Sequence, residues 1–104
     1  MAWIYLVVAG LLEVAWATGM KYSEGFSRAG WTAFTLASMI LSFALLSRAM
    51  QDLPLGTAYT VWTGIGAVGS VLLGILLFGE PAAPLRLFFI GLIVAGIAGL
   101  RYAS

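Results

Sequence analysis

Two residue types with distinctive chemistry are missing from this sequence of 104 residues, which has no cysteine and no histidine. Without cysteine there is no disulfide framework and no thiolate metal site. Without histidine the chain lacks the commonest metal ligand and the usual general base near neutral pH. We therefore expect no metal site and no cofactor.

Charge is also scarce, because 9% of the residues are charged and 62% are apolar. A soluble domain of this length has roughly 45–50% apolar and about 25% charged residues. A small globule cannot hide such an excess in its core, since it must still present a polar surface to water. The chain is therefore expected to lie in lipid. Its net charge of +1 indicates no nucleic-acid partner.

Four long stretches with few or no charges divide the sequence. A bilayer core of ~30 Å takes about 20 helical residues, whereas the strands of a β-barrel would show alternating segments of ~10 residues. The continuous runs predict an all-α membrane protein, a bundle of four transmembrane helices that forms one domain over residues 1–104. The expected spans are 2–20, 29–48, 57–78 and 84–101, joined by short polar linkers.

The basic residues are nearly balanced across the expected membrane. With four spans, Arg48 and Arg101 share one side, and Lys21, Arg28 and Arg86 share the other. Orientation in the membrane follows the bias in Lys and Arg. Either this difference of one charge suffices to orient the chain, or the chain inserts both ways.

Glu13 is the one acidic residue in the middle of an expected span. A central acidic residue costs ~2.5–3.5 kcal/mol on insertion scales and is a functional candidate by default. The alternative is a protonated, structural glutamate that is hydrogen-bonded inside the bundle. Desolvation favours the neutral acid, so a carboxyl group here can hold either a proton or a cation. That exclusive choice is the basis of proton-coupled exchange.

Four further residues are candidates for a site around Glu13. Gly10 and Trp16 each lie three residues from Glu13 and share its helix face. Because glycine has no side chain, Gly10 leaves space beside Glu13. Trp16 is too deep for an interfacial tryptophan; its N–H needs a partner, for which Glu13 is nearest, unless Trp16 only packs. Tyr59 and Trp62 also share a helix face. Either both rings lie at the membrane interface, or they form an aromatic surface beside a bound cation.

Ser42 is a lone hydroxyl in the second span, which either bonds its own helix or serves the site. Residues 64–69 spell GxGxxG, but this spacing marks a dinucleotide site only after a strand. Inside an apolar span it favours close packing or bending. Gly91, Ala95 and Gly99 form a stripe of small residues, suited to packing within the chain or to a dimer interface.

Together these features resemble the small multidrug resistance family of proton-coupled exporters over the whole chain. The resemblance rests on four short spans, one acidic residue in the first, the run LPLGTAYTVWTGIG at 53–66 and the loop KYSEGF at 21–26. Gly10, Trp16 beside Glu13 and the run TGIGA at 63–67 resemble the guanidinium-exporter subtype. The resemblance implies a transporter that is not an enzyme, in the plasma (cytoplasmic) membrane of a prokaryote.

The resemblance also implies roles for individual residues. Glu13 would bind both the proton and the substrate, and Trp16 and Ser42 would hydrogen-bond its carboxylate. Trp62 would line the pocket, and Tyr59 would help to switch access between the two sides. The family works as antiparallel homodimers of dual topology joined through the fourth span, which fits the balanced charges and the stripe from Gly91 to Gly99.

Thr60 departs from the small apolar residue that the family pattern leads us to expect, which bears on substrate range. Guanidinium suits a carboxylate because it is planar and offers paired N–H donors. A second hypothesis is a multidrug exporter of quaternary ammonium or other lipophilic cations, which would rely on aromatic faces. A third is a non-transporting membrane accessory subunit, which leaves Glu13 unexplained.

Overall fold

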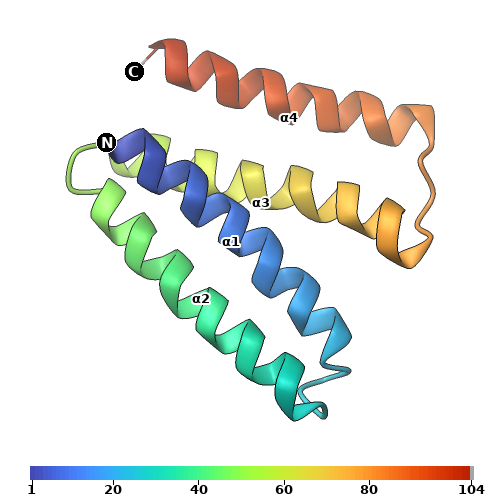
Figure 1. The fold of residues 1–104 in the computed structure, drawn as a ribbon. Helices are drawn as coiled ribbons and strands as arrows, with labels where there is room; N and C mark the ends of the chain where they lie inside the picture. The colour runs from blue at the N-terminus through green and yellow to red at the C-terminus, as the bar shows by residue number, and fades with distance from the viewer. Residues whose placement is uncertain (104) are drawn as a thin grey trace.

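The computed structural model describes residues 1–103 and folds them into four helices (Figure 1). They are α1 (Ala2–Tyr22), α2 (Ala29–Ala49), α3 (Leu55–Phe78) and α4 (Pro84–Ala103). Each has 20 to 24 residues and is long and apolar enough to cross a membrane. The predicted all-α membrane fold with four helices is confirmed. Each helix begins and ends within two residues of its expected span.

The helices pack in the order α2, α1, α3, α4 (Figure 1). α1 and α2 form a tight antiparallel hairpin, and α3 packs mainly on α1. α4 packs along α3, reaches α1 through the contact of Arg101 with the Trp3 ring, and has no buried residue. The two ends of the described chain lie at the same end of the bundle. The fourth helix is therefore a peripheral element, and any site between α1, α2 and α3 is built without it.

Local backbone chemistry sets the helix ends. Gly79 ends α3 in the left-handed conformation, with φ of 67°, which glycine adopts without steric cost. The N–H of Glu80 then turns back and donates to the carbonyl of Gly74 at 3.2 Å. Pro84 opens α4, as its fixed φ and missing N–H favour. The loop that follows α3 is also held by an ion pair of 2.9 Å between Glu80 and Arg86.

Different contacts hold the two ends of the bundle together. Near the chain ends, buried apolar residues from α1, α2 and α3 form one cluster: Leu6, Ala9, Leu46, Ala49, Ala58, Val61 and Trp62. At the opposite end the Tyr22 ring stacks on Trp31 with centroids 4.7 Å apart and meets Phe78 at 5.0 Å. The apolar cluster and the group of three rings each join α1, α2 and α3. The middle parts of these helices are therefore fixed relative to one another from both ends.

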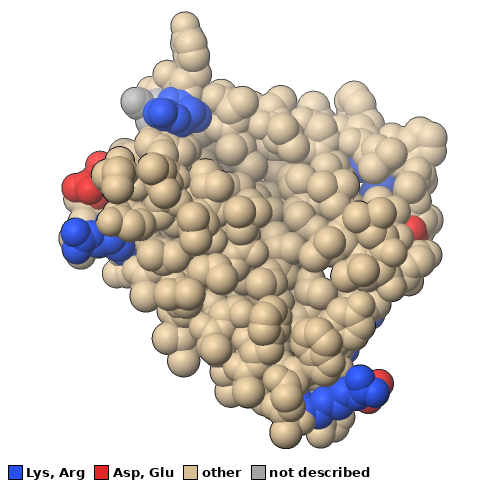
Figure 2. Space-filling view, in the orientation of Figure 1, with Lys and Arg blue, Asp and Glu red and all other residues tan. Residues whose placement is uncertain are grey.

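Charged side chains gather at the edges of the molecule, and the surface between them is uncharged (Figure 2). The chain order puts Arg48 and Arg101 at the end of the bundle that holds the chain termini, and Lys21, Arg28 and Arg86 at the other. Such an uncharged band is the surface that a bilayer covers.

Candidate functional site

Glu13 lies where α1 passes α3 near the middle of both helices. Its carboxylate occupies the space in front of Gly66, so a Cβ at position 66 would overlap it. One turn further on, Val14 fills the corresponding space in front of Gly69. These two glycines of the GxGxxG run therefore permit close packing between α1 and α3 within the chain, which was one of the two interpretations of the run.

Gly10 also marks a close approach of α1 to α3. A Cβ built at this position would come within 2.7 Å of the Cβ of Ile65. The space expected beside Gly10 is thus occupied by Ile65. Gly10 acts here by letting the two helices approach, which in turn sets how near Glu13 comes to Gly66.

Glu13 and Trp16 present an unpaired acceptor and an unpaired donor. Among the described residues, Glu13 Oε1 and Trp16 Nε1 are buried side-chain atoms without a hydrogen-bond partner. The expected bond between Trp16 and Glu13 is not formed in this structure. A buried polar atom without a partner is costly and calls for an explanation. The two atoms belong to residues one turn apart on α1, which makes this position the candidate for a binding site.

Ser42 ties three helices together next to this site. Its buried hydroxyl donates to the carbonyl of Ala9 on α1 at 2.7 Å and accepts from Trp62 Nε1 on α3 at 3.0 Å. Ala9 lies one turn before Glu13. The structure thus pairs Ser42 with neither its own helix nor Glu13, and makes it the residue that holds the Trp62 indole in place.

A chain of aromatic rings leads away from Trp16. Ring centroids lie 6.4 Å apart between Trp16 and Phe43, 5.7 Å between Phe43 and Trp62, and 5.7 Å between Trp62 and Tyr59. Trp62 is only 7% exposed, so it is a buried wall of the bundle, whereas Tyr59 is 53% exposed. Phe43 was not predicted, because nothing in an apolar span distinguishes one phenylalanine from another.

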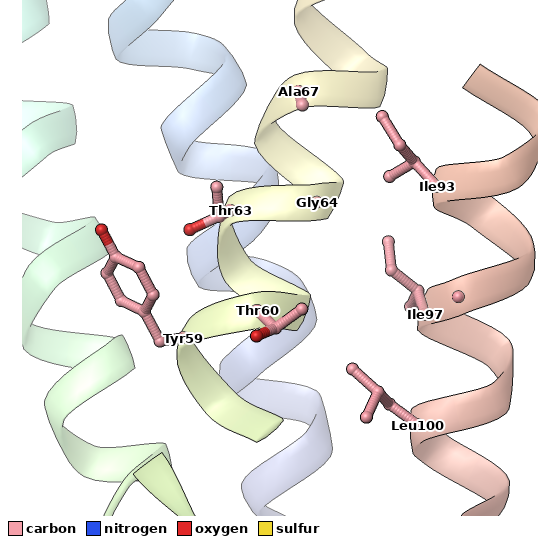
Figure 3. Close-up of a pocket in the computed structure, with 9 residues that line it drawn as sticks. Tyr59, Thr60, Thr63, Gly64, Ala67, Ile93, Ile97 and Leu100 are labelled. Atoms are coloured by element: carbon pink, nitrogen blue, oxygen red, sulfur yellow. The ribbon is translucent and has the colours of Figure 1, made fainter. Parts of the chain in front are cut away.

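A separate groove of about 540 Å³ lies between α3 and α4 (Figure 3). Glu13 does not line this groove, whereas Tyr59, one of the predicted site residues, does. Thr60 lines this groove, which places it away from the Glu13 carboxylate. In the described part of the chain, no three His, Cys, Asp or Glu residues come together as metal ligands.

The stripe of small residues on α4 is uncovered. Gly91, Ala95 and Gly99 are exposed, and a Cβ added at either glycine would meet nothing within 4 Å. They therefore do not pack within the described chain.

Comparison with known proteins places the chain in a family. The model of the small multidrug resistance protein family matches residues 1–93. A protein of Yersinia pseudotuberculosis named guanidinium exporter is 61% identical over 104 residues, covering 100% of both chains. Proteins with the same name from Citrobacter freundii and Salmonella typhimurium are 60% and 59% identical, each over 100% of this chain and 99% of the relative. The chain belongs to the small multidrug resistance family.

Proposed function

We propose that this protein exports guanidinium, and small substituted guanidinium cations, in exchange for protons. The observation that carries the proposal is the buried Glu13 Oε1 without a hydrogen-bond partner, one helical turn from the equally unpaired Trp16 Nε1. The name of the relatives, guanidinium exporter, supports the same substrate. A carboxylate in apolar surroundings binds a proton or a cation but not both, and this competition couples the two movements.

The chemistry of guanidinium suits the groups proposed for the site. Its planar fork of N–H donors pairs with a carboxylate through two charge-assisted hydrogen bonds. Its flat faces can rest on aromatic rings, which Trp16 and Trp62 offer. Ser42 holds the Trp62 indole through a 3.0 Å bond, so it acts on the pocket through Trp62. The Tyr59 ring meets Trp62 and is half exposed, which supports a role for Tyr59 in changing access as the cation binds or leaves.

We also propose that the working unit is an antiparallel homodimer in the bacterial plasma membrane. The near balance of Lys and Arg supports insertion in both orientations. The uncovered stripe of Gly91, Ala95 and Gly99 supports a partner on α4. Two Glu13 carboxyl groups that meet in such a dimer titrate as a coupled pair. Alternating access then follows from exchange of roles between the two subunits, as with inverted repeats.

Exchange by the purified protein in proteoliposomes tests the function. A pH gradient, acidic outside loaded vesicles, is expected to drive guanidinium out as protons enter, because protonation of Glu13 on the acidic side releases the cation. Tetramethylammonium, which has no N–H donor, should move far more slowly. Faster movement of tetramethylammonium than of guanidinium would support the multidrug hypothesis. No movement of either cation would support an accessory subunit.

Gly66→Ala is expected to weaken guanidinium binding by about tenfold or more, the effect of losing one charge-assisted hydrogen bond. The added methyl group overlaps the Glu13 carboxylate, which must swing away from its position. Because that carboxylate ends a flexible side chain, the fold should persist. Isothermal titration of guanidinium at fixed pH measures the loss, and circular dichroism checks the fold.

Gly64→Ala is the matched control, since it adds the same methyl group to the other side of α3. There the methyl approaches the end of the flexible Ile97 side chain, at 2.7 Å from its Cδ1. It should bind guanidinium nearly as the parent does. Equal losses in the two variants would mean that the Gly66 position acts through helix packing and not through Glu13.

A further inference from the structure

The groove between α3 and α4 shares Tyr59 with the proposed site, but Glu13, Trp16 and Trp62 do not line it, and it is predominantly apolar. Ile93, Ile97 and Leu100 point from α4 toward α3, which faces them with Gly64 and Ala67 (Figure 3). Its volume of about 540 Å³ is within the range of small-molecule sites. All the residues that line the groove belong to α3 and α4, and none belongs to α1 or α2. Within a membrane, an apolar space of this kind is filled by hydrocarbon.

A basic residue, Arg101, is next in sequence to a residue that lines one end of the groove. Arg101 follows Leu100, which lies opposite Thr60 at the end of the bundle that holds the chain termini (Figure 3). The Arg101 guanidinium lies over the Trp3 ring, with 4.7 Å between its Cζ and the ring centroid. The side chain therefore reaches from α4 to α1. Tryptophan and arginine together are typical of the level where lipid headgroups begin.

Arg101 has no acidic partner in the described part of the chain. The ion pairs found there join Arg28 to Glu24 and Arg86 to Glu80, both at the opposite end of the bundle. Trp3 covers one face of the guanidinium plane and leaves its N–H donors free, because these lie along the edges. Paired N–H donors fit the oxygens of a phosphate.

A second copy of the chain is a poor occupant for the groove. On the proposed function, a partner packs on the stripe of Gly91, Ala95 and Gly99. Ala95 lies two residues from both Ile93 and Ile97, which is about 200° around an α-helix from each. The stripe therefore faces nearly opposite to the groove, and a partner seated on it leaves the groove open.

We propose that this groove binds one anionic phospholipid, with its phosphate on Arg101 and one acyl chain between α3 and α4. The apolar walls account for the acyl chain, and the Arg101 guanidinium, which follows Leu100 in the sequence and has no acidic partner among the described residues, accounts for the headgroup. The chain would enter beside Thr60 and Leu100 and run toward Ala67 and Ile93. Such a lipid would hold α4, which has no buried residue of its own, against α3.

Native mass spectrometry of the detergent-purified protein, mixed with equal amounts of phosphatidylglycerol and phosphatidylcholine, tests the proposal. The parent should retain one phosphatidylglycerol per subunit in preference to phosphatidylcholine. Arg101→Gln should lower that preference about fivefold, the effect of one cation near an anionic surface. Arg48→Gln is the matched control, because Arg48 lies at the same end of the bundle on α2. Equal effects of the two variants would overturn the headgroup assignment.

A second pair of variants tests the acyl chain. Gly96 lines the groove, and a Cβ added there meets nothing within 4 Å, so Gly96→Leu fills the groove without disturbing its walls. It should lose both lipids, whereas Gly96→Ala should keep them. Full lipid retention by Gly96→Leu would overturn the site. The site would also be overturned if Gly96→Leu lost the dimer mass in the same spectra while it kept the lipid, because a partner subunit would then occupy the groove. Neither readout depends on transport, so both stand if guanidinium exchange fails.

Discussion

Glu13→Gln is expected to abolish proton-driven guanidinium transport while the protein still folds. The amide has nearly the shape of the protonated acid, so it fits the same space in front of Gly66. It carries no charge and releases no proton, so it can neither pair with guanidinium nor couple exchange. Loss of a hydrogen-bonded pair with a charged group costs about 3 kcal/mol, or roughly a hundredfold in affinity.

Two measurements and one control make this result specific. Guanidinium flux from proteoliposomes under a pH gradient reports transport, and titration calorimetry reports binding and its fall at low pH. Glu24→Gln makes the same chemical change in an exposed loop, where Glu24 forms a 3.4 Å pair with Arg28. An exposed pair of this kind contributes little, so this variant should transport normally. Proton-coupled flux that survives in Glu13→Gln would refute the role of the carboxylate.

The helices and the central residue could be predicted from the sequence because lipid imposes simple rules. A membrane helix must be long and apolar, so the charges, together with Pro84 at the start of the fourth helix, predict the helix ends within two residues. The same rule makes a mid-span carboxylate conspicuous, since its burial is costly. Glu13 therefore stands out without any knowledge of its neighbours. The aromatic pair of Tyr59 and Trp62 likewise follows from helical spacing alone.

The partners of these residues could not be predicted, because a helix that is apolar on every side gives no sign of which face meets which neighbour. Spacing placed Trp16 beside Glu13, but the structure leaves its indole N–H unpaired. Ser42 bonds to a main-chain carbonyl of another helix, which no side-chain pattern records. The Glu13 carboxylate lies against Gly66 because of how far α1 is shifted along α3, and the sequence does not record this shift.

Biasing the orientation of the chain is the second change expected to abolish function. Five Lys and Arg residues are divided two against three between the membrane faces, and a few added charges are expected to decide such a balance. Adding Lys at the exposed positions Ser47, Gln51 and Ala103 favours one orientation, and adding Lys at Ala82 and Ala83 favours the other. Each biased variant alone should form no antiparallel dimer and should transport no guanidinium.

Coexpression of the two oppositely biased variants should restore transport, because each supplies the partner that the other lacks. The native chain has no cysteine, so a single Cys reports orientation without background. Tyr102→Cys places it at a side chain that is 96% exposed near the end of α4. An impermeant thiol reagent should label about half of the unbiased chains in intact cells, as equal insertion both ways requires. It should label nearly all of one biased variant and almost none of the other. Full transport by a protein that labels from one side only would refute the antiparallel dimer while leaving the chemistry at Glu13 untouched.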